Sequence, residues 1–318
     1  MKAAVLHAIG ETPHCEAFPD PRANDGEVLV RVRAASLKPV DRQIASGSHY
    51  ASPREFPVVC GIDGVGILQD GARVFFAGPR RPYGAMAELA VVRRTQCLPV
   101  PEGLSDDVAA AVPNPGVSAW LSLNWRARLV RGETVLVLGA TGVTGQLAVQ
   151  IAKLLGAQRV IAAGRNKQVL DGLGSRGADA VISLDDSETN VTAAFAREAS
   201  TSGFQVIIDY LWGRPTEALL AAITRREFAS ITSEIRLVQA GESAGPTITL
   251  PAAVLRSTAV SILGTAGIPE PTMMRDAFDN VMTHAVNGKL RIDTQRVPLS
   301  EIETAWNYAG RSRLLVVP

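Results

Sequence analysis

Cysteine is scarce in this sequence: Cys15, Cys60 and Cys97 are the only three, and they lie far apart in the chain. An odd number of widely separated cysteines argues against a framework of disulfide bonds. No apolar run approaches the roughly 18 residues that would predict a membrane-spanning helix. The apolar stretch near the start, in MKAAVLHAIGETP, is too short for a secretion signal. These absences favour a protein of the reducing cytoplasm.

A strong charge bias is absent as well. The 32 Lys and Arg and the 31 Asp and Glu leave a formal net charge of +1, so nothing in the charge balance predicts nucleic-acid or membrane partners. Internal repeats and low-complexity segments are also missing. With 318 residues, 47% of them hydrophobic, the chain is typical of a soluble globular protein and long enough for two domains.

Residues 1 to about 100 contain short strand patterns separated by turns. The segment EVLVRVRAAS (27–36) alternates apolar and polar residues, as a strand with one buried face does. Clusters of turn-forming residues lie at 19–26, 45–57 and 77–84. Several short strands at such close spacing predict a small β-barrel or a partly open sheet.

From about residue 112 the pattern changes to alternating strand and helix segments. ETVLVLG (133–139) is a continuously apolar run, typical of a strand covered on both faces. TGQLAVQIAKLLGA (144–157) has apolar residues at helical spacing, with Gly156 as the expected end of a helix. Further strands are predicted at 159–163, 180–183, 204–209, 227–232 and 259–264, followed by a helix at 273–288 and a strand at 313–318. This alternation predicts an open, mainly parallel sheet with right-handed crossovers.

The glycine-rich loop GATGVTG (139–145) has the spacing G-x-x-G-x-x-G and not the more familiar G-x-G-x-x-G. It follows a predicted strand and opens a predicted helix, which is the context of a dinucleotide-binding loop. Gly139 would end the strand, Gly142 would let the backbone approach a pyrophosphate, and Gly145 would let the helix pack against the sheet. The N–H groups at the start of the helix would then face the anion. The alternative is a purely structural turn.

No acidic residue stands at the end of the second strand of this region, where an NAD site usually has one for the ribose hydroxyl. The sequence there is AAGRNK (162–167). A carboxylate would repel a 2′-phosphate, whereas Arg165 offers a planar set of donors to it. The predicted cofactor is therefore NADPH. The alternative is that Arg165 is a solvated surface residue.

Four segments together resemble one family: GIDGVGIL (61–68), YGAMAELAVV (83–92), LPVPEGLSDDVAAAVPNPGVSAW (98–120) and GATGVTGQLAVQIAKLLGA (139–157). They are similar to the medium-chain dehydrogenase/reductase superfamily, and most of all to its zinc-free, ζ-crystallin-like quinone oxidoreductase branch. The resemblance implies an α/β fold with a Rossmann doubly wound parallel sheet and a GroES-like β-rich catalytic domain. It assigns 1–115 and 270–318 to the GroES-like domain and 116–269 to the Rossmann NADPH-binding domain. It also implies a homodimer, in which an edge strand near 258–267 pairs with its copy.

The residues that bind zinc in other members of the superfamily are missing here. Where those members carry a catalytic Cys and a Gly-His-Glu, this chain has Lys38 and Gly61-Ile62-Asp63. An ammonium group and an isoleucine side chain have no electron pair to donate, so a three-ligand zinc site cannot form. The four clustered cysteines of a structural zinc lobe are absent too. The sequence predicts no bound metal.

The loop and the resemblance together predict these cofactor-binding residues: Ser118, Thr141, Gly142, Val143, Thr144, Gly145, Gly164, Arg165, Asn166, Leu263, Gly264 and Thr265. Two further residues are catalytic candidates. Tyr50 matches a tyrosine that lines the nicotinamide pocket, and the position of Lys38 faces the nicotinamide in the relatives. Lys38 would stabilise the negative charge that develops on a substrate oxygen; the alternative is that it points to solvent or contacts a cofactor phosphate.

Three departures from quinone reductases stand out. Lys38 replaces a common Asn, Leu184 replaces a Tyr near the adenosine phosphate, and the predicted fifth strand ends in SITSE (230–234) where a glycine is usual. They leave the shape of the pocket, and so the substrate, open.

Chemistry without zinc limits the substrate. Hydride addition to a simple ketone creates an alkoxide about as basic as hydroxide, for which the pKa of water is about 15.7. Addition to a quinone creates an anion comparable to tyrosinate, with a pKa of about 10, so roughly 7 kcal/mol less charge stabilisation is needed. A conjugated enone similarly spreads the charge as an enolate.

We therefore expect an NADPH-dependent reductase of quinones or α,β-unsaturated carbonyl compounds. Two alternatives stay open. One is a zinc-independent ketone or alcohol oxidoreductase that uses Tyr50 or Lys38 as the acid. The other is a non-catalytic NADPH-binding sensor, since a fold alone does not guarantee turnover.

Overall fold

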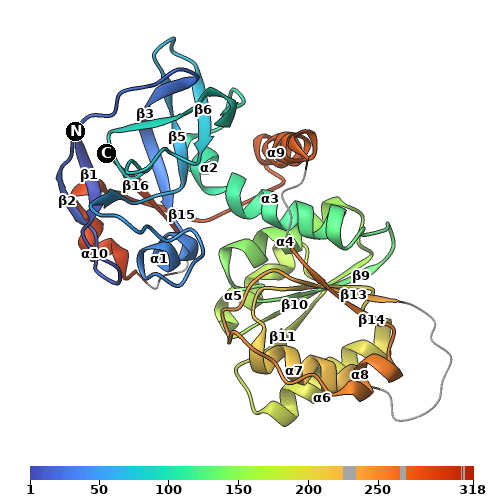
Figure 1. The fold of residues 1–318 in the computed structure, drawn as a ribbon. Coiled ribbons are helices and arrows are strands. Elements are labelled where there is room, and N and C mark those ends of the chain that lie inside the picture. The colour runs from blue at the N-terminus through green and yellow to red at the C-terminus, as the bar shows by residue number, and fades with distance from the viewer. Residues whose placement is uncertain (225–233, 266–269, 309, 311) are drawn as a thin grey trace. The chain divides into compact units, whose positions relative to one another are not determined.

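The computed structural model describes residues 1–318 apart from 225–233, 266–269, 309 and 311. The chain forms two compact units (Figure 1). They are unit 1, with Met1–Asn114, Met282–Gly288 and Ile292–Pro318, and unit 2, with Pro115–Val281 and Lys289–Arg291. Residues 270–281, which the sequence assigned to the GroES-like domain, therefore fall in unit 2 by their packing.

Unit 1 is built around one long strand, β3 (Glu27–Leu37), which confirms the strand predicted at 27–36. Val32 and Ala34 are buried while Arg31 and Arg33 are exposed, because successive side chains of a strand point to opposite faces. The larger sheet has the order β15-β16-β3-β5-β6-β8, and β7 also pairs with β3. Its other strands are β5 (Asp63–Leu68), β6 (Arg73–Ala77), β7 (Leu89–Arg93), β8 (Cys97–Pro99), β15 (Thr294–Pro298) and β16 (Arg313–Val317).

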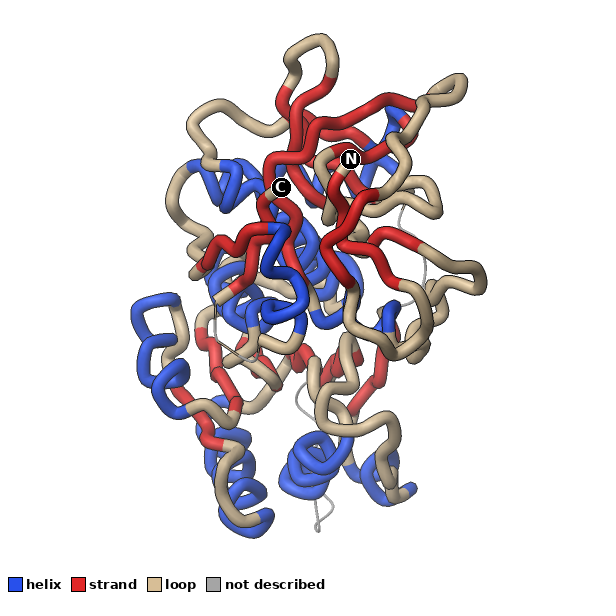
Figure 2. The backbone as a smooth tube through the Cα atoms, turned by 90° about the vertical axis from the view of Figure 1, so that its left-hand side faces the viewer, coloured by secondary structure: helices blue, strands red, loops and turns tan. Residues whose placement is uncertain are grey.

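A smaller sheet of unit 1 has the order β2-β1-β4. Its strands are β1 (Lys2–Leu6), β2 (His14–Ala17) and β4 (Val58–Val59). The unit also contains the short helices α1 (Pro39–Ala45), α2 (Asp106–Ala111) and α10 (Ile302–Trp306). Both ends of the chain lie in this unit and close together (Figures 1 and 2), since β16 pairs with β3 and completes the larger sheet.

Unit 2 contains a six-stranded sheet in which every described pairing is parallel, in the order β11-β10-β9-β12-β13-β14. Its strands are β9 (Thr134–Leu138), β10 (Arg159–Gly164), β11 (Ala180–Ser183), β12 (Val206–Asp209), β13 (Ile235–Gln239) and β14 (Val260–Gly264). Numbered within the unit, the order is three-two-one-four-five-six, the doubly wound Rossmann arrangement. The predicted fold class is confirmed.

Helices cover the sheet of unit 2 (Figure 1). The helices of unit 2 are α3 (Pro113–Leu121, which starts in unit 1), α4 (Val143–Leu154), α5 (Lys167–Gly172), α6 (Glu188–Ser202), α7 (Gly213–Ile223), α8 (Ala252–Ser257) and α9 (Pro271–Val286, which ends in unit 1). Phe195 of α6, Leu219 of α7 and Val254 of α8 pack in one apolar cluster with Leu136 and Ile207 of the sheet. In the described ranges, no helix is both long and apolar enough to cross a membrane.

The strand predicted at 227–232 lies outside the described residues. The fifth strand of the described sheet is β13, Ile235–Gln239, which was not predicted from the sequence. A glycine does follow this strand, because Gly241 stands two residues after its end. The expected departure at SITSE was therefore wrong. The edge position predicted for the strand near 258–267 is confirmed, since β14 ends the sheet.

Candidate active site

The glycine loop of unit 2 forms a tight turn from β9 into α4. Gly139 has a φ of +85°, a conformation that side chains rarely adopt. A Cβ atom on Gly145 would lie 2.2 Å from the carbonyl oxygen of Gly139, so only glycine lets the helix approach the end of the strand this closely. Both glycines thus have the packing roles that the spacing predicted.

The start of α4 has the geometry of an anion site. Gly142 is the N-cap residue and contributes no side-chain cap, and the first N–H groups of a helix have no partner within it. A Cβ atom on Gly142 would meet only the carbonyl oxygen of Gly139, at 3.4 Å. The strand order reverses between β9 and β12, and open parallel sheets bind ligands outside the carboxyl ends of such a strand pair. The loop therefore fits the pyrophosphate of a dinucleotide.

The end of β10 lies against this loop. A Cβ atom on Gly164 would lie 2.5 Å from the methyl carbon of Thr141. Arg165, the next residue, is exposed and forms no ion pair within the described part of the chain. Asn166 caps α5, since its Oδ1 accepts a hydrogen bond from Val169 N at 3.2 Å. Arg165 is thus a free cation beside the loop, whereas the carbonyl oxygen of the Asn166 side chain already has a partner.

The remaining predicted cofactor residues also lie in unit 2. Ser118 is an exposed residue of α3, and Leu263 and Gly264 end the edge strand β14. Leu263 is half-buried, and Gly264 and Thr265 are exposed. No side-chain hydrogen bond within the described residues engages the hydroxyl of Ser118 or Thr265.

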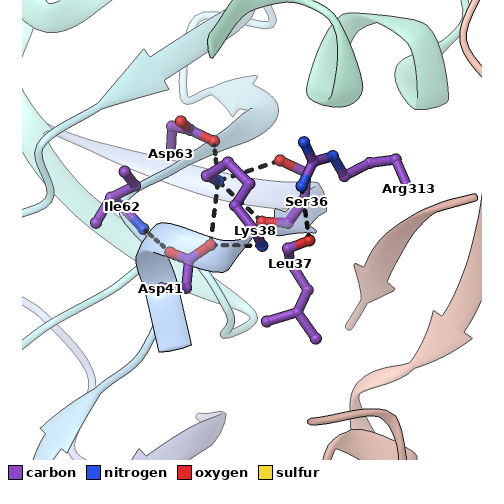
Figure 3. A network of polar contacts seen from close by, with 7 residues as sticks. All are labelled: Ser36, Leu37, Lys38, Asp41, Ile62, Asp63 and Arg313. Atoms are coloured by element: carbon purple, nitrogen blue, oxygen red, sulfur yellow. Dashed lines mark hydrogen bonds and ion pairs between the residues drawn. The ribbon is translucent and has the colours of Figure 1, made fainter. Parts of the chain in front are cut away.

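Lys38 lies in the interior of unit 1, with 2% of its surface exposed. Its Nζ donates hydrogen bonds to Asp63 Oδ1 at 2.7 Å and to the Ser36 carbonyl oxygen at 2.9 Å and hydroxyl oxygen at 3.1 Å. Asp41 Oδ2 also lies near this ammonium group, 3.4 Å from Nζ. Figure 3 shows both carboxylates pointing at this ammonium group. The alternative in which Lys38 points to solvent is therefore wrong, and its three N–H donors are used inside the protein.

This network joins four segments of unit 1 (Figure 3). Asp41 Oδ2 accepts from Lys38 N at 2.8 Å, and Asp41 Oδ1 accepts from Ile62 N at 3.2 Å. Arg313 of β16, 5% exposed, donates to the Leu37 carbonyl oxygen at 3.0 Å. Burial raises the pKa of Asp63, an effect that the charge of Lys38 opposes. The residues do not fit a metal ion, because an ammonium group and not an electron-pair donor faces Asp63.

Tyr50 lies on the loop between α1 and β4 and is 97% exposed. Its ring is packed against that of His49, with 4.0 Å between the centroids, and the Ala51 N–H donates to His49 Nδ1 at 3.1 Å. Beside this loop lies a largely apolar cavity of about 210 Å³, whose lining includes Ala51, Pro53, Ile44, Cys60, Ile62 and Asp41. Burial raises the pKa of the Cys60 thiol to about 12, so it stays protonated and unreactive at neutral pH.

Sequence reasoning missed Asp209, the last residue of β12. Asp209 is fully buried and accepts hydrogen bonds from Leu211 N at 2.8 Å, Trp212 N at 2.9 Å and Thr216 Oγ1 at 2.5 Å. Burial raises its pKa. Its carboxylate organises the turn at the carboxyl end of the strand beside β9. The signal was present in the sequence, because an acid ends the predicted strand 204–209.

Two family models match the two parts of the chain. Residues 24–102 match the alcohol dehydrogenase GroES-like domain, and residues 143–282 match the family described as zinc-binding dehydrogenase. The first match agrees with the strand-rich unit 1, and the second covers most of the Rossmann sheet. The predicted GroES-like domain is confirmed.

Individual relatives agree with these matches. Acryloyl-coenzyme A reductase of Metallosphaera sedula is 30% identical over 250 residues, which are 68% of this chain and 71% of that protein. Quinone oxidoreductase of Sus scrofa is 31% identical over 205 residues, 61% of this chain and 60% of that protein, so the match spans less than two thirds of the relative. The quinone oxidoreductase of Thermus thermophilus, solved also as its complex with NADPH, superposes with a TM-score of 0.81 and 26% identity over the whole of both chains. The chain therefore belongs to the medium-chain dehydrogenase/reductase superfamily, in its quinone oxidoreductase branch.

Proposed function

We propose that the protein is an NADPH-dependent oxidoreductase that transfers hydride to a quinone or an α,β-unsaturated carbonyl compound without a metal. One observation carries the proposal: the uncapped start of α4 lies at the reversal of strand order, beside the exposed Arg165 and with no acid at the end of β10. The nicotinamide of a bound dinucleotide would supply the hydride. The chain's own residues would bind and orient the cofactor and the acceptor, and would exclude water from them.

The cofactor would be held by the backbone and by one cation. The N–H groups of Val143, Thr144 and Gly145 are directed outward at the start of a helix and would bind the pyrophosphate. Arg165 would pair with the 2′-phosphate, which favours NADPH over NADH. The remaining contacts would come from residues around the carboxyl edge of the sheet: Ser118, Thr141, Gly142, Gly164, Asn166, Leu263, Gly264 and Thr265.

The substrate class follows from the charge that has to be stabilised. Lys38 has all three donors engaged within unit 1, which supports a role in holding α1 and the Ile62 segment rather than direct contact with substrate. A substrate that delocalises its own charge needs no cation beside its oxygen and is therefore favoured. The names of the relatives include a quinone oxidoreductase and a reductase of acryloyl-coenzyme A, a conjugated carbonyl compound. Tyr50 would offer its exposed ring to a flat substrate next to the apolar cavity.

A homodimer is part of the proposal. β14 is an edge strand of the sheet, and an uncovered strand edge presents unpaired N–H and C=O groups to a second copy. Pairing of two such edges about a twofold axis would close the assembly.

Oxidation of NADPH with a panel of acceptors tests the function. Quinones and enones should be reduced and simple ketones should not. Reduction of simple ketones at comparable rates would favour the ketone or alcohol oxidoreductase. NADPH binding with no turnover on any acceptor would favour the sensor.

A further inference from the structure

A buried glutamine, Gln146, follows the glycine loop directly, near the start of α4. Only 8% of its surface is exposed, and a buried amide group needs hydrogen-bond partners. Its Nε2 donates to the Thr141 carbonyl oxygen of the loop at 3.2 Å, and its Oε1 accepts from Arg176 Nη1 at 2.7 Å. Gln146 therefore joins the loop to the short 3₁₀ helix at Leu173–Arg176.

Among side chains of this length, only an amide suits these two partners. A guanidinium group can only donate hydrogen bonds and a carbonyl oxygen can only accept them. The side chain between them must therefore accept on one atom and donate from the other. Because Arg176 donates to Oε1, the Gln146 amide has its N–H group toward Thr141. A carboxylate or an apolar side chain could not donate there.

Gln146 determines which way the carbonyl groups of the loop face. The peptide group between Thr141 and Gly142 has its oxygen on Gln146, and its N–H donates to the Gly139 carbonyl oxygen at 3.0 Å. The next carbonyl oxygen, that of Gly142, accepts from Gln146 N at 2.9 Å. Gln146 thus binds two successive carbonyl oxygens, one through its side chain and one through its backbone. Oxygens turned toward a bound pyrophosphate would instead repel it, because both are negatively charged.

The bond to Thr141 matters because this peptide group can otherwise turn easily. Its rotation changes ψ of Thr141 and φ of Gly142, and glycine restricts φ less than any other residue. The methyl carbon of Thr141 lies against Gly164, which fixes the side chain but not the carbonyl group. The orientation of the peptide group therefore depends on its two hydrogen bonds, of which Gln146 supplies one.

Resting on the proposed function, we propose that Gln146 is a positioning residue for the dinucleotide: it keeps the Thr141 carbonyl oxygen turned away from the pyrophosphate. Arg176 keeps the Gln146 amide in the orientation that this requires. Neither side chain needs to touch the cofactor. The loop has its binding conformation before the cofactor arrives, which lowers the free-energy cost of binding.

A second buried glutamine of α4, Gln150, offers a matched control one turn further along the helix. It is 5% exposed. Its Nε2 donates to the carbonyl oxygens of Gln146 and Arg291, both at 3.0 Å, and its Oε1 accepts from Arg291 N at 2.8 Å. Its amide thus holds a segment other than the glycine loop. Replacement of either glutamine by methionine keeps the length of the side chain and removes the amide.

The test is the Kd of three ligands, measured by calorimetry. In Gln146→Met the Kd values for NADPH and for NADH should each rise about fivefold to tenfold, because both ligands contain the pyrophosphate. The Kd for adenosine 2′-monophosphate, which has the 2′-phosphate but no pyrophosphate, should not change. Gln150→Met should leave all three Kd values unchanged, although it also loses buried hydrogen bonds. A residue that only supports the fold would not separate the ligands in this way.

Arg176→Met tests the same inference from the surface side. It should raise the Kd values for both dinucleotides by a smaller factor than Gln146→Met does, since the amide keeps its donor but loses the group that orients it. In the double variant with Gln146→Met it should add nothing, because Arg176 acts through Gln146.

Two results would overturn the inference while leaving the proposed function intact: wild-type affinity of Gln146→Met for both dinucleotides, or Kd values for all three ligands that rise together. If Gln146→Met did not fold, unchanged Kd values for both dinucleotides in Arg176→Met would overturn it. If the wild-type protein bound neither dinucleotide, the proposed function and this inference would both fail.

Discussion

Arg165 of unit 2 and Lys38 of unit 1 are the two cations among the predicted site residues, but their surroundings differ. Arg165 is exposed and has no ion-pair partner in the described residues, so it is available to a ligand. Lys38 is 2% exposed and lies between two carboxylates. A free cation can select a ligand, whereas a buried and paired cation maintains the structure around it. These two roles lead to opposite expectations for substitution.

Arg165→Ala should weaken NADPH binding by about tenfold to a hundredfold, because a charge-assisted hydrogen bond to the 2′-phosphate is lost. NADH binding should change little, since NADH has no such phosphate. The measurement is the Kd of each cofactor by calorimetry. Arg197→Ala, on the exposed face of α6, is the control and should affect neither. Equal losses for both cofactors would contradict the role given to Arg165.

Lys38→Met should destabilise the folded protein by about 3–5 kcal/mol near neutral pH, because Asp41 and Asp63 remain buried without their cation. The loss should depend on pH. Burial already raises the pKa of Asp63 and Lys38 opposes this effect, so the substitution should raise the pKa further. An acid whose pKa is higher in the folded than in the unfolded state loses stability as the pH rises from its unfolded pKa through its folded pKa. Chemical denaturation should therefore find a smaller loss at about pH 5 than at about pH 8.

The double variant Lys38→Met with Asp63→Asn serves as the control for this prediction. It removes the titrating carboxylate, so most of the pH dependence should disappear and part of the stability should return. A loss that is the same at both pH values in Lys38→Met would show that Asp63 is not the group that depends on Lys38.

In the turn from β9 into α4, we expect Gly145 to matter for stability and Gly142 to matter for cofactor binding. Gly145→Ala would bring Cβ within 2.2 Å of a backbone oxygen, so we expect a destabilisation of about 1–3 kcal/mol from overpacking. In Gly142→Ala the new Cβ atom would contact only the carbonyl oxygen of Gly139, at 3.4 Å. The φ of Gly142 is −77°, which alanine adopts freely. The substitution should leave the melting temperature of the free protein nearly unchanged but raise the Kd for NADPH by at least about tenfold, because the methyl group occupies the approach of the pyrophosphate. A Gly142→Ala protein with wild-type affinity would show that the pyrophosphate does not lie on this loop.

Elements with a strong local signal were predictable from the sequence. The strands β9 and β10, the helix α4 and its glycine loop all have apolar runs or spacings that need no distant partner. β13 was missed because Ile235–Gln239 is short and carries an arginine near its start, and its place is fixed by pairing with β12 and β14.

The burial of Lys38 was not predictable for a similar reason. Its partner Asp63 is 25 residues away in the chain, and Arg313 comes from the C-terminal strand. A local pattern cannot indicate which distant carboxylates will surround a lysine. The resemblance identified Lys38 as a residue at a functional position of the family, whereas its partners became clear only from the tertiary structure.

For the whole molecule, we expect two copies of the 33.6 kDa chain joined through the β14 edges. An edge strand that ends a sheet of parallel strands is open to pairing with another copy. Sedimentation equilibrium at micromolar protein concentration should give the mass of a dimer. The mass of a single chain would refute the assembly, while leaving the binding site as described, because every residue of the proposed cofactor site comes from one chain.

The proposed reaction is hydride transfer from NADPH to an acceptor that stabilises its own negative charge, with no metal involved. The most direct test is the steady-state rate of NADPH oxidation by protein dialysed against a metal chelator, with cyclohexenone and with cyclohexanone as matched acceptors. These two ring compounds differ in the conjugated double bond and in little else. Cyclohexenone should be reduced at least about tenfold faster than cyclohexanone, and the chelator should not lower the rate. Equal rates with both acceptors, or activity that is lost with the chelator and restored by zinc, would contradict the proposed reaction.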